Sequence, residues 1–568
     1  MSTAAHDAPD LAARNSARTT SPLRRAGLVG TVGAALLLLS GLLSWCYDDR
    51  ILGDISIRFY PAGIQLYAMV LGLVGLVLGL LLLRGARWLT PGRGLKVLGI
   101  ASLVFVVGAL IAIAKQAGGL VNANEGAWVA LVGALAMTAA GFLARHEPDL
   151  DPRRWPRLPA VAEILVIVVA LAALLFVAAH ALNLDDAATF ACLLVALTGL
   201  GIALMASGFG AWLGFVSGNH RHVLTLAAFV VAFLFPFTQN GSDANMSIAT
   251  QILIFAATAI GLNIVVGLAG LLDLGYIAFL GTGAYVSAML SNSAFATIGW
   301  KPPFLVVMLL GGLTAALLGL IIGSPTLRVS GDYLAIVTLA FGEIFRLAMF
   351  NLDGNNGPKL TNGPNGIPSI PDLQIGSFNF GDTHTVAGIP LGRFSNYYFV
   401  LLLLIGFIIL VFTRLNNSRI GRGWVAIRED ERAAEAMGVN VFGLKLLAFA
   451  GGAFLAGLAG TIKAHQDSSV SPDQYVFLES AFLLAAVVLG GMGTIAGVLV
   501  GATILKLLPE KLREVNDYRL LLFGLLLVLM MRLRPEGLVA SKRRQLEFHD
   551  DDEGLAQEIE AEHLEERA

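Results

Sequence analysis

The sequence predicts an all-α polytopic transmembrane helical bundle, and three observations carry this prediction. Hydrophobic residues make up 56% of the 568 residues and charged residues only 14%, against about 25% charged residues in an average soluble domain. The mean hydropathy is +0.75. Apolar stretches of membrane-crossing length recur along the chain, and inside a bilayer only helices or closed barrels satisfy every backbone polar group. A water-soluble fold and a disordered chain are therefore excluded.

Sixteen apolar stretches have the length and composition to cross or enter the bilayer, where a crossing takes about 20 residues. Seven lie in the first part of the chain: 26–44, 62–83, 95–114, 126–144, 160–182, 187–216 and 222–238. Nine follow: 247–268, 270–291, 303–325, 332–350, 397–413, 443–462, 475–492, 495–508 and 518–532. Two of them, 270–291 and 495–508, are open to being half-helices, because the first is interrupted by glycines and the second is short.

The distribution of Lys and Arg predicts the orientation in the membrane. Basic residues gather at 14–25, 84–96, 145–157, 414–445 and 532–544. They are scarce at 183–186, 239–245 and 351–396. Alternating the chain across sixteen crossings places every dense basic cluster on one side. Both termini are therefore predicted to be cytoplasmic.

Composition also predicts how the chain is organised, because polar residues within or next to the spans become more frequent after residue 240. We expect a cytoplasmic N-terminal tail at 1–25 and an accessory membrane region of about seven helices at 26–240. The functional membrane core is expected at 241–540, followed by an acidic cytoplasmic tail at 541–568.

Several classes of function are excluded by what the sequence lacks. The patterns Gly-x-x-x-x-Gly-Lys-Ser/Thr, His-Glu-x-x-His and Gly-x-Ser-x-Gly are absent, so neither a nucleotide-binding loop nor a hydrolase site is indicated. The two cysteines, Cys46 and Cys192, make neither a metal-ligand cluster nor a disulfide framework. The net charge of −2 does not indicate a nucleic-acid partner. We therefore predict no catalytic residue and no metal ligand.

The charged segment 414–443 is the most informative part of the chain. Its pattern predicts one short helix from Ile427 to Met437, which Gly438 stops. Ile427, Ala434, Met437 and Val441 can share an apolar face, with charged residues on the other. Such a pattern fits either an ordinary interfacial helix or a docking helix for a cytoplasmic partner. The residues expected to form it are Ile427, Arg428, Glu431, Arg432, Ala433, Ala434, Glu435, Met437 and Gly438.

A family resemblance rests on this segment and on motifs around it. Ala433-Ala434 followed by Gly438 resembles the Glu-Ala-Ala-x-x-x-Gly loop by which ABC importer permeases engage their ATPases, with Arg432 in place of the Glu. Further motifs follow in order within 245–540, at 261–279, 327–339, 361–367, 488–493, 519–524 and 534–538. Together they resemble the M-type permease subunit of Liv-type branched-chain amino acid importers.

The resemblance implies a permease subunit of an ATP-driven importer in a bacterial inner membrane, carrying branched-chain or related hydrophobic amino acids. It implies an H-type permease partner, two ATPase subunits that bind ATP and Mg²⁺, and a periplasmic solute-binding protein. This chain would supply half of the translocation pathway and bind no cofactor itself. Two alternatives remain open: a urea or short-amide permease of the same architecture, and an autonomous ion-coupled carrier. The autonomous carrier would have no use for a cytoplasmic docking loop, because it needs no ATPase.

Six polar or aromatic residues inside or beside the predicted spans are candidate pathway or gate residues, because polar groups are costly there: Asn263, Asp273, Tyr276, Glu343, Arg346 and Glu479. Each also has a structural interpretation. Glu343 and Arg346 are three residues apart on one helix face, which fits an ion pair. Asn263 can hydrogen-bond between helices, Asp273 can cap the next helix, and Tyr276 can pack. The turn-rich segment 351–396 predicts a structured outer cap that receives the binding protein.

Overall fold

The computed structural model describes residues 8–47, 63–326, 332–355, 357–512 and scattered positions between 521 and 539, apart from 87, 146, 148–149, 151–154, 157 and 185. The predicted stretch 518–532, the motif positions 327–331 and 519–524, and the tail 541–568 lie wholly or largely outside the described residues. The described residues form two compact units. Unit 1 runs to Thr238 and includes a few residues from Lys511, and unit 2 runs from Gln239 to Glu510.

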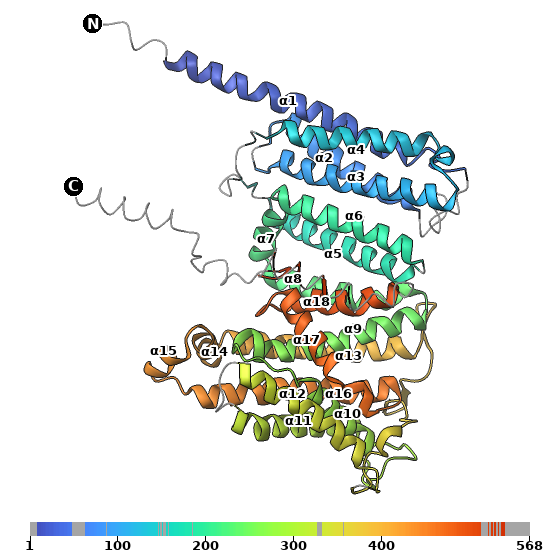
Figure 1. Ribbon diagram of the computed structural model, residues 1–568, viewed down its shortest axis with the longest axis vertical. Coiled ribbons are helices and arrows are strands. Elements are labelled where there is room, and N and C mark those ends of the chain that lie inside the picture. The colour runs from blue at the N-terminus through green and yellow to red at the C-terminus, as the bar shows by residue number, and fades with distance from the viewer. Residues whose placement is uncertain are drawn as a thin grey trace, which may run out of the picture. The chain divides into compact units, whose positions relative to one another are not determined.

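Unit 1 is built from long apolar helices that lie side by side (Figure 1). They are α1 (Ala8–Ser40), α2 (Ile64–Leu83), α3 (Pro91–Gln116), α4 (Glu125–Leu143), α5 (Ala160–Asn183), α6 (Ala187–Ala206), α7 (Phe209–Asn219) and α8 (Arg221–Leu234), with short 3₁₀ turns η2 (Leu120–Asn122) and η4 (Phe235–Gln239). Helix α1 packs on α2 and α4, and α3 packs on α4 and α6. The expectation of one continuous stretch over 187–216 is wrong, because Gly208 adopts a φ of +79° that ends α6 before α7 begins.

Unit 2 holds the rest of the described helices and four short strands. Its helices are α9 (Asp243–Asn263), α10 (Ile277–Leu290), α11 (Phe304–Thr326), α12 (Asp332–Asn351), α13 (Arg393–Asn416), α14 (Arg419–Glu429), α15 (Glu431–Ala436), α16 (Val441–Asp467), α17 (Phe477–Gly490) and α18 (Ile495–Lys511). A π-helical turn η5 (Ile264–Leu268) extends α9, and 3₁₀ turns lie at η6 (Gly363–Asn365) and η7 (Pro472–Tyr475). Helices α9, α10 and α11 pack around α16, which places the apolar core of unit 2 along that helix.

The segment between α12 and α13 is a structured cap, as its turn-rich sequence predicts. Strands β1 (Gln374–Ile375) and β2 (Phe378–Asn379) form one antiparallel hairpin, and β3 (His384–Val386) and β4 (Ile389–Leu391) form another. Arg393 ties the cap to the bundle, because its guanidinium lies 2.7 Å from Asp372 and donates to the His465 carbonyl oxygen at 2.8 Å.

The all-α, polytopic prediction is confirmed in its coarse form. Among the described residues, 13 helices are long and apolar enough to cross a membrane. They correspond to all of the predicted stretches except 270–291, 495–508 and 518–532. In the first of these, helix α10 has only 14 residues, and the second forms α18, which has 17.

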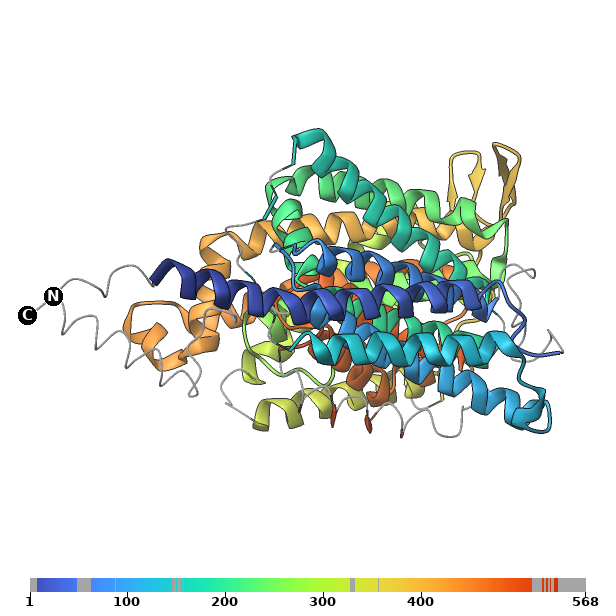
Figure 2. The same ribbon diagram turned by 90° about the horizontal axis from the view of Figure 1, so that it is seen from above.

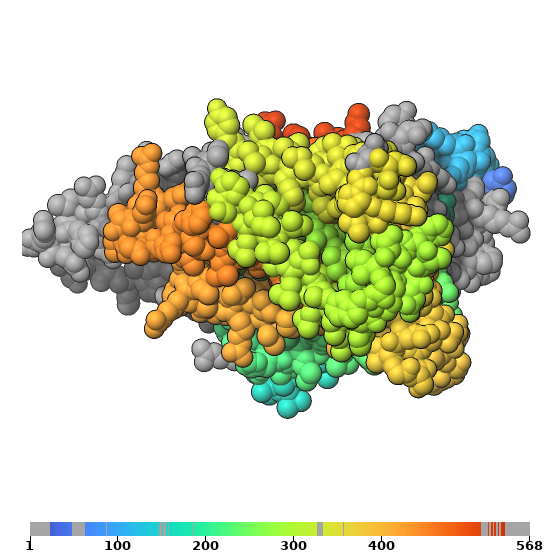
Figure 3. Space-filling model, turned by 90° about the horizontal axis from the view of Figure 1, so that it is seen from below, coloured from blue at the N-terminus to red at the C-terminus, as the bar shows by residue number. Residues whose placement is uncertain are grey.

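The cap and the α14–α15 segment lie at opposite ends of unit 2. Helix α13 joins them and has 24 residues, which corresponds to about 36 Å at 1.5 Å per residue. Figure 2 shows the hairpins of the cap at one end and α14 and α15 at the other. The space-filling view in Figure 3 shows the orange α14–α15 segment protruding from its end of the unit. A bilayer crossed by α13 would therefore separate these two features.

Candidate functional site

The predicted docking segment forms two helices rather than one. Helix α14 ends at Glu429, and Asp430 adopts an extended conformation with φ −152° and ψ 110°. The Asp430 carboxylate then accepts hydrogen bonds from the backbone N–H groups of Arg432 and Ala433, both at 2.9 Å, and so caps the start of α15. The prediction of one helix over 427–437 is therefore wrong, because an N-cap aspartate interrupts it. Gly438 has a φ of +83° and follows the end of α15.

The apolar residues of this segment do not share one face. Ile427 and Ala434 are each 5% exposed and pack against the unit, whereas Met437 is 85% exposed. Glu431, Arg432, Ala433 and Glu435 are exposed as well. The segment therefore presents a methionine among charged side chains, beyond the end of the bundle.

Three polar contacts anchor the segment to the bundle. The Trp424 indole N–H donates to the Leu444 carbonyl oxygen at 2.7 Å, and Lys445 Nζ lies 2.6 Å from Glu431 Oε1. Arg428 Nη1 donates to the Gly267 carbonyl oxygen in η5 at 3.0 Å. Because these contacts reach both α16 and the turn after α9, the segment is held at a fixed position on unit 2.

The segment 269–276 between η5 and α10 is non-helical and mostly buried, with Gly270 and Leu272 exposed. The Leu274 N–H donates to Thr338 Oγ1 of α12 at 3.0 Å, and the Tyr276 hydroxyl donates to the Gly452 carbonyl oxygen of α16 at 2.6 Å. Non-helical backbone is tolerated at membrane depth only where protein buries it or where it lines a cavity. This segment therefore has the character of a functional element held between transmembrane helices.

Asp273 lies in this segment and is 1% exposed. One carboxylate oxygen accepts from the Gly275 N–H at 2.9 Å, and among the described residues the other has no hydrogen-bond partner. The structure does not bear out the capping interpretation, because the N-cap of α10 is Tyr276 and the first N–H of the helix, that of Ile277, donates to Ser480 Oγ at 3.0 Å instead of to Asp273. A buried carboxylate oxygen in a non-helical turn leaves the gate interpretation of Asp273 standing as a hypothesis.

Asn263 joins the end of α9 to the turn between α17 and α18. Its side-chain oxygen accepts from the Gly493 N–H at 2.8 Å, and its side-chain nitrogen donates to the Thr494 carbonyl oxygen at 3.3 Å. The residue is fully buried. These contacts correspond to the inter-helix hydrogen bonds that the sequence allowed.

Replacing Asn263 with leucine is expected to lower the thermal stability of the protein. The change leaves the Gly493 N–H without its partner and removes one of two donors to the Thr494 carbonyl oxygen, which keeps the Val498 N–H at 3.4 Å. A buried unsatisfied group costs about 1–3 kcal/mol. The melting temperature of the purified protein measures the effect. It is determined from the monodisperse fraction that size-exclusion chromatography recovers after heating. Thr258→Val is the matched control, because the Thr258 hydroxyl is buried in α9 and bonds only within its own helix, to Ile254. Equal melting temperatures for the two variants would contradict the bridging role.

Glu343 and Arg346 form the predicted ion pair on α12. Arg346 Nη2 lies 2.6 Å from Glu343 Oε1, and Nη1 lies 3.5 Å from Asp473 in the turn before α17. The Glu343 side chain is 42% exposed in this single chain. The structure therefore pairs Glu343 and Arg346, and it leaves the glutamate on an open surface of unit 2.

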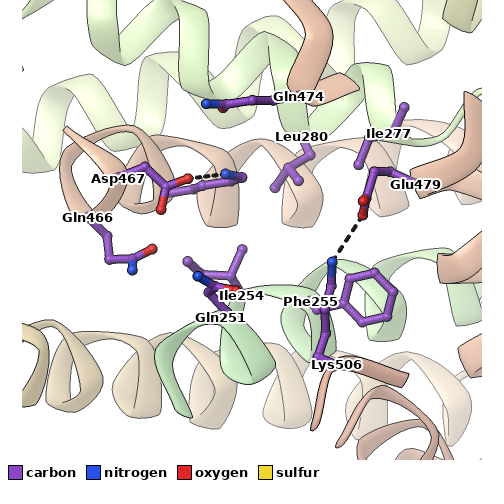
Figure 4. A pocket seen from close by; sticks show the side chains of 11 residues that line it. Gln251, Ile254, Phe255, Ile277, Leu280, Gln466, Asp467, Gln474, Glu479 and Lys506 are labelled. Carbon is purple, nitrogen blue, oxygen red and sulfur yellow. Dashed lines mark hydrogen bonds and ion pairs between the residues drawn. The ribbon is translucent and has the colours of Figure 1, made fainter. Parts of the chain in front are cut away.

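Glu479 lines a cavity inside unit 2 and is paired with Lys506 of α18, whose Nζ lies 3.1 Å from Glu479 Oε2 (Figure 4). Sequence reasoning missed Lys506, Gln251, Gln466 and Gln474, which also line this cavity. The structure also pairs Lys463 with Asp467, and both line the cavity. The spacing of four residues between Lys463 and Asp467 was a usable signal, whereas no local spacing links Glu479 to Lys506.

No metal centre is formed in the part of the chain that the structure describes, where no group of three or more His, Cys, Asp or Glu side chains is placed to hold an ion. The chemical groups that the site brings together are hydrogen-bonding and ion-paired side chains along transmembrane helices. Such groups can bind and guide a solute.

Comparison with known proteins gives the family. The family model described as "Branched-chain amino acid transport system / permease component" matches residues 244–531. This chain belongs to that family. It is therefore a non-catalytic permease component of a branched-chain amino acid ABC transport system. The matched range begins in α9, so α1–α8 lie outside it.

Individual relatives agree. The chain is 40% identical over 342 residues to the high-affinity branched-chain amino acid transport system permease protein LivM of Salmonella typhimurium, covering 58% of this chain and 77% of that protein. LivM of Escherichia coli gives the same identity and coverage. The permease protein LivH of Salmonella typhimurium is 25% identical over 296 residues, covering 50% of this chain and 91% of that protein. No solved structure matches. The chain is thus a multi-pass membrane protein, homologous to the inner-membrane protein LivM.

Proposed function

We propose that this chain is the M-type permease of an ATP-driven importer and that the solutes it carries are branched-chain or related hydrophobic amino acids. An H-type permease would supply the other half of the pathway, and a periplasmic solute-binding protein would deliver the amino acid to the cap. Two ATPase subunits would bind ATP and Mg²⁺. Support for the substrate and for the H-type partner comes from the names of the similar LivM and LivH proteins.

The observation that carries the coupling part of this proposal is the α14–α15 segment. It protrudes beyond the bundle, is anchored by Trp424 and Arg428, and exposes Met437 among charged side chains. An exposed apolar side chain surrounded by charged groups is typical of the centre of a docking surface. We assign this segment to contact with an ATPase.

Arg428 connects the proposed ATPase contact to the membrane-embedded part of unit 2, so a movement of one can be transmitted to the other. It bonds the Gly267 carbonyl in η5, and η5 follows Asn263, which holds the turn at Gly493. Movement of α14 would therefore be transmitted to the non-helical segment 269–276, in which the buried Asp273 is a candidate gate. A π-helical turn next to non-helical backbone is an element that can adopt two arrangements.

The orientation and the segment roles are also proposals. The basic segment 414–445 supports a cytoplasmic location for α14 and α15, and the cap at the other end of α13 would then face the periplasm. Both termini would be cytoplasmic. We assign residues 241–540 to the permease core, residues 26–240 to an accessory membrane region, and 1–25 and 541–568 to tails.

Replacing Met437 with aspartate is expected to lower recovery of the ATPase subunits with this chain by about tenfold, which corresponds to about 1.4 kcal/mol of binding free energy. A charge would replace the apolar centre of the docking surface. Co-purification from the native membrane in mild detergent measures the recovery. Met437→Leu is the matched control and should bind as the unchanged chain does, because the apolar surface is kept.

Three other outcomes would redirect the proposal. Equal recovery with Met437→Asp would remove Met437 from the docking surface. A chain that purifies alone and takes up solute without ATPases would favour an autonomous ion-coupled carrier. If the complex drives uptake of urea but not of leucine in proteoliposomes, the substrate assignment is wrong and the short-amide alternative replaces it.

A further inference from the structure

A cavity of about 270 Å³ lies inside unit 2, among helices α9, α10, α16, α17 and α18 and the turn η7. This volume is slightly below the range of about 300–1,000 Å³ that is typical of sites for drug-sized ligands, so the cavity suits a smaller molecule. Figure 4 shows its lining side chains pointing toward a common space from these elements.

Two ion pairs bound the cavity, and together they carry no net charge. Lys506 is paired with Glu479, and Lys463 is paired with Asp467. Figure 4 shows Asp467 on one side of the cavity and the Lys506–Glu479 pair on the other. Lys463, Asp467 and Glu479 lie on helices long enough to cross a membrane, and Lys506 lies on the shorter α18. Charged side chains inside a membrane are costly, and such groups often mark a solute route. Their arrangement provides one cationic and one anionic group on each side.

Two unsatisfied acceptors point to a missing hydrogen-bond donor. Gln466 is only 2% exposed and its side-chain nitrogen donates to Thr250 Oγ1 at 3.3 Å. Over the described part of the chain, the side-chain oxygens of Gln466 and Gln474 have no hydrogen-bond partner. Both residues line the cavity. A buried acceptor without a partner costs about 1–3 kcal/mol, and a bound ammonium group would satisfy it.

The remaining wall of the cavity is apolar. It is formed by Ile254, Phe255, Ile277 and Leu280. Lys506 Nζ lies 4.6 Å from the centre of the Phe255 ring, so this cation sits where the polar and apolar walls meet. A ligand that fits must therefore carry a positive group, a negative group and an aliphatic side chain within a small volume.

We propose that this cavity is a binding site for the zwitterion of an aliphatic α-amino acid within a single permease chain. The amino acid's carboxylate accepts hydrogen bonds from Lys506, and its ammonium group donates to Asp467 and to Gln466. An ammonium side chain has three N–H donors, and Glu479 accepts one of those of Lys506, so a donor can serve the ligand. The aliphatic side chain lies against Ile277 and Leu280. This assignment rests on the proposed import of hydrophobic amino acids. It adds the position inside this chain at which the solute binds during transport.

Binding of radiolabelled leucine to the whole importer in lipid nanodiscs, without its solute-binding protein, tests the site. The complex should bind leucine saturably, and Lys506→Met and Asp467→Asn should each weaken binding at least about tenfold. Lys359→Met and Asp382→Asn are matched controls, because both are exposed residues of the cap that do not line the cavity. Lys506→Arg keeps the positive charge but has a larger planar group, so it should weaken binding less than Lys506→Met does.

Ligand analogues test the same site on the unchanged protein, so the result does not depend on a variant that folds. Leucinamide lacks the carboxylate and 4-methylpentanoate lacks the ammonium group, and neither should displace leucine at equal concentration. Displacement by either analogue as effective as that by leucine would overturn the zwitterion site, as would unchanged binding in both variants.

ATP-driven uptake by the unchanged complex, with its solute-binding protein restored, separates this inference from the proposed function. Uptake of leucine without saturable binding to the permease would refute the cavity site and leave the function intact. Absence of leucine uptake would refute the function on which the site rests.

Discussion

Replacing Arg428 with alanine is expected to reduce ATP-driven leucine uptake at least tenfold while the ATPases remain bound. Arg428 Nη1 donates to the Gly267 carbonyl oxygen at 3.0 Å, and its side chain packs against Gly270. Hydrogen bonds to charged groups contribute about 1.5–3 kcal/mol, so their loss detaches α14 from η5. The exposed Met437 surface is unchanged. Uptake and ATP hydrolysis by the reconstituted complex in proteoliposomes measure the two effects separately.

Arg422→Ala is the matched control for Arg428→Ala. Arg422 lies on the same helix, six residues earlier, and is exposed. It should leave the ratio of solute imported to ATP hydrolysed unchanged. If Arg428→Ala gives the same ratio as the unchanged chain, the route from α14 through Gly267 does not couple the two activities, and the anchors at Trp424 and Lys445 become the candidates.

The membrane helices were predictable because hydropathy and length reflect the same bilayer that the helices must cross. Most predicted stretches match helices to within a few residues, as 160–182 does with α5 at Ala160–Asn183. The exceptions have local causes. The glycine-rich stretch 270–291 becomes a non-helical segment followed by the short α10, since residues before α10 bond to neighbours such as Thr338 instead of forming a helix.

The site was predictable only where the relevant contacts are local. Glu343 and Arg346 pair as the spacing of three residues indicates. The break at Asp430 was also local but was missed, because an aspartate after a glutamate in a charged run was interpreted as part of one helix instead of as an N-cap. Asn263 with Gly493 and Lys506 with Glu479 are joined by tertiary packing alone. No periodicity in the sequence specifies those pairs.

The chain contains 64 glycines, and small residues allow membrane helices to pack closely. One contact shows how close this packing is. Helices α10 and α16 approach each other at Gly283 and Gly460, where side chains are absent. A Cβ atom added at Gly460 would lie 2.0 Å from the Leu280 carbonyl oxygen and 2.9 Å from the Ala284 nitrogen. Both neighbours are backbone atoms of a buried helix, so no side chain can move to make room.

Replacing Gly460 with alanine is therefore expected to destabilise the core severely. Overpacking costs about 1–3 kcal/mol where side chains can adjust, and a clash with backbone should reach or exceed the upper end because α10 and α16 must separate. Helix packing in membranes depends on such close contacts between small residues. We expect a large fall in melting temperature and in the yield of monodisperse protein, measured by size-exclusion chromatography after heating.

Gly451→Ala on the same helix is the control for this prediction. The change adds the same methyl group, but no atom lies within 4 Å of the position where its Cβ would stand. Its melting temperature should stay within about 2 °C of that of the unchanged protein, as is usual for substitutions that disturb no packing. If Gly460→Ala melts like Gly451→Ala, the two helices are able to separate at little cost. The tight α10–α16 contact would then not hold segment 269–276 in place, and the rigidity of that segment would have to come from its hydrogen bonds to Thr338 and Gly452.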